Sequence, residues 1–170
     1  MTVLTFCLTL LTSVAQTQQP SFLESLRQKS AHDCVSVDYE FATVMSGMKV
    51  TGEGTVEIQG NSYHMKGEGI EIFCDGSTSW MIDEAAKEVF IEAADSQSAG
   101  YLANPVLLLM NLEENIGSYK VNGNMITLEL PDGSPLEITV NSLETVPTQK
   151  TEAFRPPTDF DSSWIVTDLR

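Results

Sequence analysis

The most constraining feature of this sequence is an alternation of apolar and polar residues with a period of two. In the stretch CVSVDYEFATVM, residues 34–45, the apolar side chains Val35, Val37, Tyr39 and Phe41 alternate with polar ones. Successive side chains of an extended strand point to opposite faces, so this pattern predicts a strand with one buried and one exposed face. The chain therefore has to fold around the apolar face of a sheet.

The alternation continues along most of the chain and is divided by glycine-containing turns. It predicts further strands at 50–58, 63–66, 70–74, 78–83, 88–92, 119–121, 125–130 and 136–140. Turns are expected at residue types that accept a positive φ at little cost, namely Gly60-Asn61, Gly67-Glu68-Gly69, Asp75-Gly76 and Asp132-Gly133. Gly52 and Gly54 stand inside a predicted strand, which indicates a bend or bulge there.

Two segments have the signals of helices instead. Ser21 and Glu24 form a capping box that predicts a short amphipathic helix at about 21–31. A second helix is expected at 105–116, because Asn104 can cap it, Pro105 suits its first turn and Gly117 follows it. Its residues 106–110, VLLLM, are apolar around the whole axis, so this helix has to be covered on more than one side or has to cover a cavity.

This order of elements predicts an α+β fold that is mainly β. We expect a strongly curved antiparallel sheet, a barrel or half-barrel, with the helices packed on its concave apolar face.

The N-terminal residues have the pattern of a secretory signal peptide. Residues 3–11 are an apolar run without charge, and Ser13-Val14-Ala15 fits a small-x-small cleavage site. The run is shorter than the roughly 20 residues that span a bilayer. We therefore expect a signal peptide at 1–15, export across a membrane, and a single domain at 16–170.

The charge of the chain limits its partners. Asp and Glu number 24 against 9 Lys and Arg, which gives a formal net charge of −15. Such a chain repels nucleic acid and anionic lipid head groups, so neither nucleic-acid binding nor stable membrane insertion is expected.

Catalytic and metal-binding patterns are weak in this sequence. Its two histidines are His32 and His64. His32 stands near Cys34 in HDC, but no third residue that would orient the histidine is recognisable from the pattern. These residues and Cys74 have the types of zinc ligands without paired spacings, and no calcium loop or phosphate-binding glycine loop occurs. We expect no enzyme, no metal and no cofactor. Cys34 and Cys74 are either two buried thiols or, in an oxidising compartment, a disulfide.

Several segments, taken in order, resemble the periplasmic outer-membrane lipoprotein carrier family, which is LolA-like. They are FLESLRQKS before an alternating strand, IEIFCDGSTSWMIDEAAKEVFIE, NPVLLLMNL, SYKV with MITLEL, and the terminal WIVTDLR. The resemblance covers nearly all of residues 16–170 and is that of a divergent branch. The stretch QGNSYHMK, residues 59–66, lacks the Arg-Pro segment of well-known carriers, whose arginine is implicated in lid closure.

The resemblance implies a half-open β-barrel with the helices as a lid over its concave apolar face. It implies a monomeric, noncatalytic chaperone in the periplasm that shields the acyl chains of lipoproteins between the inner and outer membranes. It also implies an inner-membrane lipoprotein-release transporter and an outer-membrane acceptor as partners. The residues expected to line the acyl cavity are Val37, Tyr39, Phe41, Met45, Val56, Ile58, Met65, Ile72, Trp80, Ile82, Leu107, Leu108 and Met110, with Met81 and Met125 as further adaptable lining. The alternatives are a periplasmic binding protein for free lipids or another small apolar ligand, and an interaction domain with a packed core.

Overall fold

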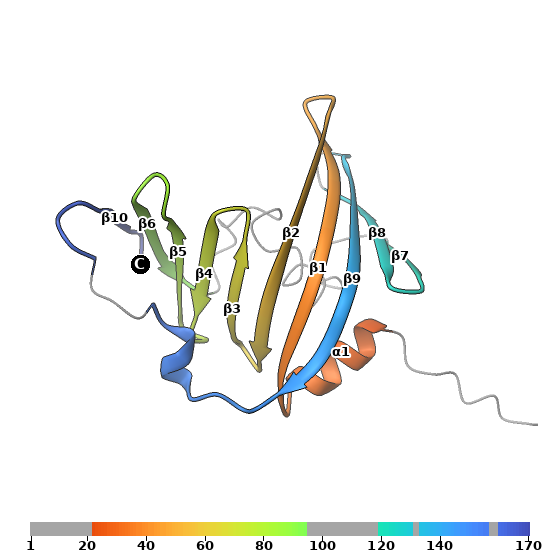
Figure 1. Ribbon diagram of the computed structural model, residues 1–170, viewed down its shortest axis with the longest axis horizontal. Helices are drawn as coiled ribbons and strands as arrows, with labels where there is room; N and C mark the ends of the chain where they lie inside the picture. The colour runs from red at the N-terminus through yellow and green to blue at the C-terminus, as the bar shows by residue number, and fades with distance from the viewer. Residues whose placement is uncertain (1–21, 95–118, 131–132, 157–159) are drawn as a thin grey trace, which may run out of the picture.

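One sheet of ten strands dominates the computed structural model of this protein, which describes residues 22–94, 119–130, 133–156 and 160–170 (Figure 1). The strands are β1 (Cys34–Met45), β2 (Met48–Gln59), β3 (Ser62–Gly67), β4 (Ile70–Cys74), β5 (Thr78–Asp83), β6 (Glu88–Ala93), β7 (Tyr119–Asn122), β8 (Met125–Glu129), β9 (Pro135–Val146) and β10 (Ile165–Asp168). The helices in these ranges are α1 (Phe22–Ser30) and the short 3-10 helix η1 (Thr151–Phe154).

The strand order across the sheet is β10-β6-β5-β4-β3-β2-β1-β9-β8-β7. Strands β1 to β6 form a meander in which each strand is antiparallel to the next, and β9 returns to pair with the free side of β1. Strand β10 pairs in parallel with β6, so the end of the chain forms one edge of the sheet.

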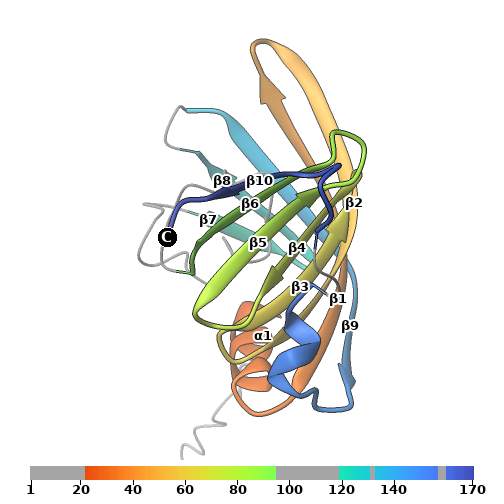
Figure 2. The ribbon, with the colours of Figure 1, turned by 90° about the vertical axis from the view of Figure 1, so that its left-hand side faces the viewer.

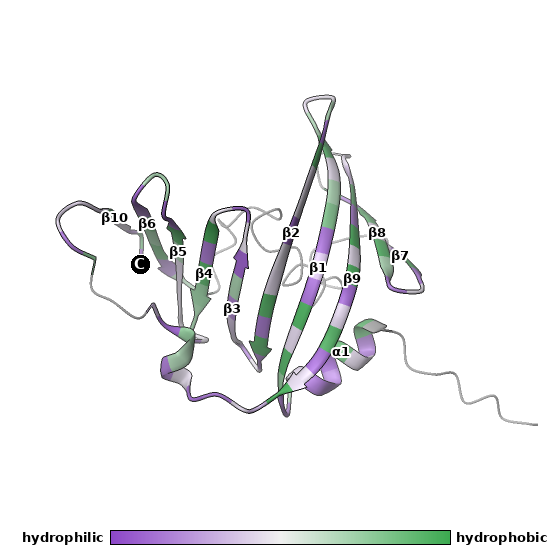
Figure 3. Ribbon diagram, in the orientation of Figure 1, coloured by the Kyte–Doolittle hydropathy of each residue, from purple (hydrophilic) through white to green (hydrophobic). Residues whose placement is uncertain are grey.

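The mainly β prediction is confirmed, and each of the nine strands expected from the alternation is present. Figure 3 shows the alternation of apolar and polar residues along the strands that caused this prediction. The turns also agree, because Gly60, Glu68, Gly69, Gly76 and Gly133 all have positive φ. Strand β9 is longer than predicted, and the terminal segment adds β10.

The expected strongly curved half-barrel is corrected by the pairing. The sheet is neither closed nor strongly curled, and its edges β10 and β7 are not bonded to each other. Strong curvature requires repeated bulges or kinks. Gly52 and Gly54 of β2 instead pair with β1 without interruption, while a register shift between Asp38 and Tyr39 occurs on the other side of β1, against β9.

Helix α1 agrees with the predicted helix at 21–31 and lies against one face of the sheet (Figure 2). Its Leu23 and Leu26 are buried in the main core, which follows from their spacing on one side of the helix. The second predicted helix, at 105–116, and the signal peptide at 1–15 lie outside the described residues.

The sheet has an apolar core on each face. The larger core contains Leu23 and Leu26 of α1 and the inward side chains of β1 to β4, β8 and β9. The smaller core contains Phe73, Ile82 and Val89, with Phe160 and Trp164 of the C-terminal segment packed against it. We call the face with the larger core the helix face and the other the outer face.

Candidate functional site: the apolar helix face

A continuous row of apolar side chains crosses four neighbouring strands on the helix face. Val37 of β1 is paired with Val56 of β2, Val56 with Met65 of β3, and Met65 with Ile72 of β4. Paired residues of neighbouring strands point to the same face, so these side chains form one surface. Each of the four is at most 2% exposed.

A second row lies beside the first. It consists of Val35, Ile58, Tyr63 and Cys74, which are paired in this order across the same strands and are all buried. On the far side of β1 the face continues with residues of β8 and β9 that the site prediction omitted, namely Ile126, Leu128, Leu136, Ile138 and Val140. Their alternation in the sequence was the available signal.

Two aromatic rings mark the end of this apolar surface, where glycine replaces larger residues on β2. Tyr39 is paired with Gly54, and Phe41 with Gly52. A methyl group built on Gly54 would lie 2.7 Å from the Tyr39 hydroxyl, and one on Gly52 would lie 2.5 Å from the Phe41 ring. The glycines therefore allow both rings to lie across the neighbouring strand, an arrangement known to compensate for glycine in sheets. Tyr39 is buried, whereas Phe41 is half-buried at the rim.

The other predicted lining residues are placed elsewhere. Trp80 and Ile82 belong to the core of the outer face, because Trp80 is paired with Phe73 while the neighbouring Met81 is paired with Ile72. The residue of β5 that reaches the helix face is thus Met81. Met45 is 48% exposed near the end of the β1–β2 hairpin, away from the core. Leu107, Leu108 and Met110 lie outside the described residues.

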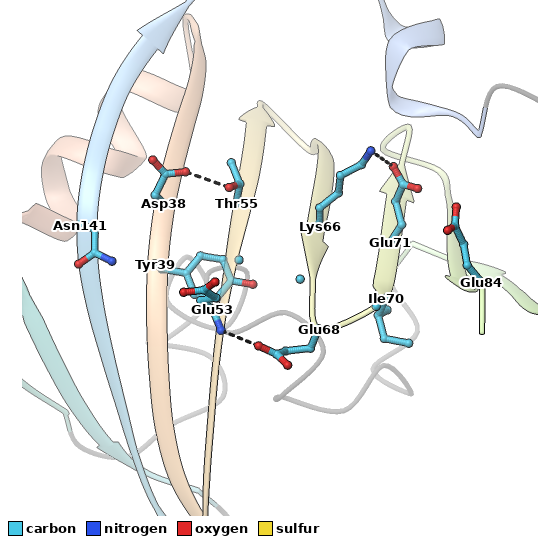
Figure 4. Close-up of a pocket in the computed structure, with 13 residues that line it drawn as sticks. Asp38, Tyr39, Glu53, Thr55, Lys66, Glu68, Ile70, Glu71, Glu84 and Asn141 are labelled. Atoms are coloured by element: carbon cyan, nitrogen blue, oxygen red, sulfur yellow. Dashed lines mark hydrogen bonds and ion pairs between the residues drawn. The ribbon is translucent and has the colours of Figure 1, made fainter. Parts of the chain in front are cut away.

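A polar hollow lies beside the aromatic rim. Its volume is about 580 Å³, and its lining includes five carboxylates, those of Asp38, Glu53, Glu68, Glu71 and Glu84. Figure 4 shows these side chains with Lys66, the one basic residue of the lining. Its chemistry is the reverse of an acyl site, because a hydrocarbon chain gains nothing among solvated carboxylates.

Hydrogen bonds favour the charged form of two carboxylates of the hollow, those of Asp38 and Glu71. Thr55 and Ser142 donate to Asp38 over 2.9 and 2.6 Å, which lowers the pKa of Asp38. Burial alone would raise the pKa of Glu71, but hydrogen bonds from Lys66 at 2.9 Å and His64 at 2.7 Å keep this pKa below its ordinary value. Asp38 and Glu71 therefore stay charged near neutral pH.

Solved structures identify this arrangement of strands. A LolA superfamily protein from Nitrosomonas europaea matches with a TM-score of 0.53 at 9% identity, over 79% of this chain and 96% of that chain. An uncharacterized conserved protein from Thermus thermophilus matches with a TM-score of 0.52 at 8% identity, over 86% of this chain and 96% of that chain.

The fold is similar to that of this LolA superfamily protein. The resemblance inferred from the sequence is thereby confirmed for the fold, and the low identity agrees with a divergent branch. No protein-family model matches the sequence, and no curated protein matches it either.

The candidate metal ligands of the sequence do not form a metal site among the described residues. In the part of the chain that the structure describes, no group of three or more His, Cys, Asp or Glu side chains could hold a metal ion. His64 stacks on Phe73, with ring centroids 4.2 Å apart, and faces Glu71. Cys34 and Cys74 are free buried thiols, and burial raises the pKa of both.

The described helices have no stretch of the length and hydropathy that crossing a bilayer requires.

Proposed function

We propose that this protein is a noncatalytic periplasmic carrier that shields the acyl chains of lipoproteins on its apolar helix face. The observation that carries the proposal is the row formed by Val37, Val56, Met65 and Ile72 on a LolA-superfamily fold. An acyl chain in water costs about 0.8 kcal/mol for each exposed CH₂ group. A broad aliphatic surface can offset that cost without directional contacts, which suits a carrier of varied cargo.

Binding on this face requires a change in packing, because the row is closed to solvent in the structure. Helix α1 covers part of the face through Leu23 and Leu26. Acyl chains would replace some of the contacts that now cover the sheet, and Met65 and Met81 would adapt to them because the thioether side chain is flexible.

The half-buried ring of Phe41 is the entry point that the geometry favours. It stands beyond Tyr39 at the end of the buried row, and it lines a second polar hollow together with Glu40, Glu53, Glu68 and Glu137. An acyl chain that slides past this ring reaches Val37 and Val56, while its polar head group remains near water. Delivery would then involve an inner-membrane lipoprotein-release transporter that loads the carrier and an outer-membrane acceptor that unloads it.

The first experiment measures binding of a fluorescent triacylated lipopeptide to the wild type and to Phe41→Glu. A charge at the rim should weaken binding at least about tenfold, because it would be desolvated by the ligand. Phe160→Glu is the matched control, since Phe160 is also half-buried but packs on the outer face. Equal affinity of the wild type and Phe41→Glu would remove the helix face from the site.

The second experiment is native mass spectrometry of the protein purified from its own periplasm. Copurified lipoprotein supports the carrier. Copurified free lipid, with equal affinity for fatty acid and lipopeptide, would favour the binding protein for free lipids.

A specific observation supports the third candidate, an interaction domain with a packed core, because Val35, Val37 and Ile138 are all 0% exposed. Absence of any lipid or lipopeptide binding would select it.

A further inference from the structure

The β1–β2 hairpin projects beyond the neighbouring strands (Figure 1). Pairing of β1 with β9 ends at Thr43, and pairing of β2 with β3 begins only at Gly54. Residues 44–49, which we call the hairpin tip, are therefore paired only with each other among the described strands. Ser46 and Gly47 form the two-residue turn, and both have positive φ, as the type I′ turn of a tight hairpin requires.

The hairpin tip exposes apolar side chains to water. Met48 is 68% exposed, Met45 is 48% exposed and Val44 is 39% exposed. Met45 and Met48 are directly paired across the hairpin, so their side chains lie next to each other on one side of the tip. Two adjacent exposed methionines at the end of a rigid ribbon form a small, convex and adaptable apolar surface.

The tip also differs from the rest of the chain in charge. Residues 41–52 contain no Asp or Glu and contain one basic residue, Lys49, in a chain with a net charge of −15. The next carboxylates along the two strands are those of Glu40 and Glu53, each five residues from the methionine pair. At about 3.4 Å per residue this separation is roughly 17 Å. On the neighbouring strand β9, Glu137 is paired with Ala42, which is three residues or roughly 10 Å along β1 from Met45. Both separations exceed the screening length of about 8 Å at physiological salt. The tip can thus approach a surface that the acidic body avoids.

We propose that the hairpin tip contacts a lipid bilayer, with Met45 and Met48 inserted among the head groups and Lys49 at the level of the phosphates. A convex apolar tip of this size enters the interfacial region, which accepts apolar groups to a depth of about 5–10 Å. The tip, residues 44–49, is much smaller than one side of a stable interface between proteins, which has about 20–30 residues. The contact is weak and reversible, so the body remains in water.

This surface is separate from the acyl-binding face, and the proposal goes beyond the carrier function. It gives the protein a means of approaching the membrane at which cargo is exchanged. The two proposals can fail independently, because vesicle binding through the tip and lipopeptide binding on the helix face involve different residues.

The test is cosedimentation of the whole protein with phosphatidylcholine vesicles over a range of lipid concentrations. The variant M45Q/M48Q keeps the length of both side chains and removes their apolar character, and we expect it to bind about tenfold more weakly. Met48→Trp should bind several-fold more tightly, because indole favours the interfacial region. Thermal unfolding checks that both variants are folded. We expect that they are, because the substituted side chains are exposed to water.

The matched control is V121Q/V166Q, which removes two other exposed apolar side chains, on β7 and β10 at the sheet edges. Its vesicle binding should equal that of the wild type. Equal binding by M45Q/M48Q and the wild type would overturn the proposal. It would also be overturned if V121Q/V166Q lost as much vesicle binding as M45Q/M48Q does. Absence of wild-type binding at the highest lipid concentration would also overturn it, and would leave an apolar groove of a partner protein as the occupant.

Discussion

Tyr39 lies across Gly54 of the neighbouring strand, and this contact depends on the missing side chain of the glycine. A methyl group at Gly54 would meet the Tyr39 hydroxyl at 2.7 Å and the backbone oxygen of Lys66 at 2.8 Å. The backbone oxygen cannot move without disturbing the pairing of β2 with β3. The ring and the glycine thus form one packing unit at the rim of the apolar face.

Gly54→Ala should therefore lower the free energy of unfolding by about 1–3 kcal/mol, the usual cost of overpacking. Gly52→Ala is the matched comparison, because its close contacts are with the side chains of Phe41 and Glu68, which can move. Urea unfolding of both variants measures the difference. A larger effect for Gly52→Ala than for Gly54→Ala would show that the backbone contact is not limiting.

The buried hydroxyl of Tyr39 should make stability depend on alkaline pH. Burial raises the pKa of Tyr39 from 10.0 to about 12. Below pH 10 the hydroxyl is protonated in both states, whereas between pH 10 and 12 the unfolded state loses its proton first, so stability falls as the pH rises. The full shift corresponds to about 3 kcal/mol.

Tyr39→Phe provides the comparison, because other side chains also titrate in this range. The difference in unfolding free energy between the wild type and Tyr39→Phe should be constant up to pH 10 and should then change in favour of the variant. A constant difference up to pH 11 would contradict burial of the hydroxyl.

Asp75 holds the turn after β4 and the C-terminal segment together. Its carboxylate accepts the backbone N–H groups of Ser77 and Thr78, both over 2.9 Å, and an N–H of Arg155 over 2.7 Å. Burial opposes the charged form, but these partners hold the pKa of Asp75 below its ordinary value of 3.8. The resulting stability is complete above about pH 4 and is lost as the pH falls through the lowered pKa.

Asp75→Asn should therefore destabilise the protein at pH 7 by about 1–3 kcal/mol, and the loss should shrink below pH 4. Arg155→Met should cost less, because the Arg155 side chain is 54% exposed and such pairs are screened by water. Urea unfolding at pH 7 and pH 3 measures both variants. A loss for Asp75→Asn that is the same at both pH values would exclude the carboxylate charge as its cause.

Cys34 and Cys74 should remain thiols. Cys34 is on β1 and Cys74 is on β4, so two strands lie between them. Val35, the neighbour of Cys34, is aligned with Cys74 across these strands through Ile58 and Tyr63. The distance across three strand spacings is about 14 Å. A disulfide requires Cα atoms within about 7 Å. Alkylation in denaturant without reductant, followed by peptide mapping, should label both residues, whereas native protein should react slowly. Labelling of neither residue in denaturant would demonstrate a bridge.

The strands were predictable because most are half-buried, so that alternation along β1 or β9 reports the two faces directly. Strand β10 differs, since Ile165 and Val166 are both exposed at a sheet edge and give no such signal. In β5 the residues Trp80, Met81 and Ile82 are all apolar, so the sequence does not say which of them faces the main core. That choice is made by the register of β5 on β4.

The shape of the sheet and the limits of the site depend on contacts that the sequence pattern does not contain. Gly52 and Gly54 predicted a bend or bulge in β2. Instead, the rings of Phe41 and Tyr39 on β1 occupy the space that larger side chains would take, and the pairing of β1 with β2 continues without interruption. Met45 continues the alternation of β1, yet it lies beyond the last residue of β1 that pairs with β9. It is exposed for that reason, and alternation alone could not distinguish it from the buried residues before it.

The most direct test of acyl binding on the helix face is NMR of the methionine methyl groups during titration with a triacylated lipopeptide. Met65 and Met81 lie on that face, whereas the indole groups of Trp80 and Trp164 belong to the outer core and serve as internal references. We predict large shifts of the Met65 and Met81 methyl signals, with the two indole signals unchanged. Unchanged Met65 and Met81 signals at saturating lipopeptide, or larger shifts at the indoles, would contradict the account.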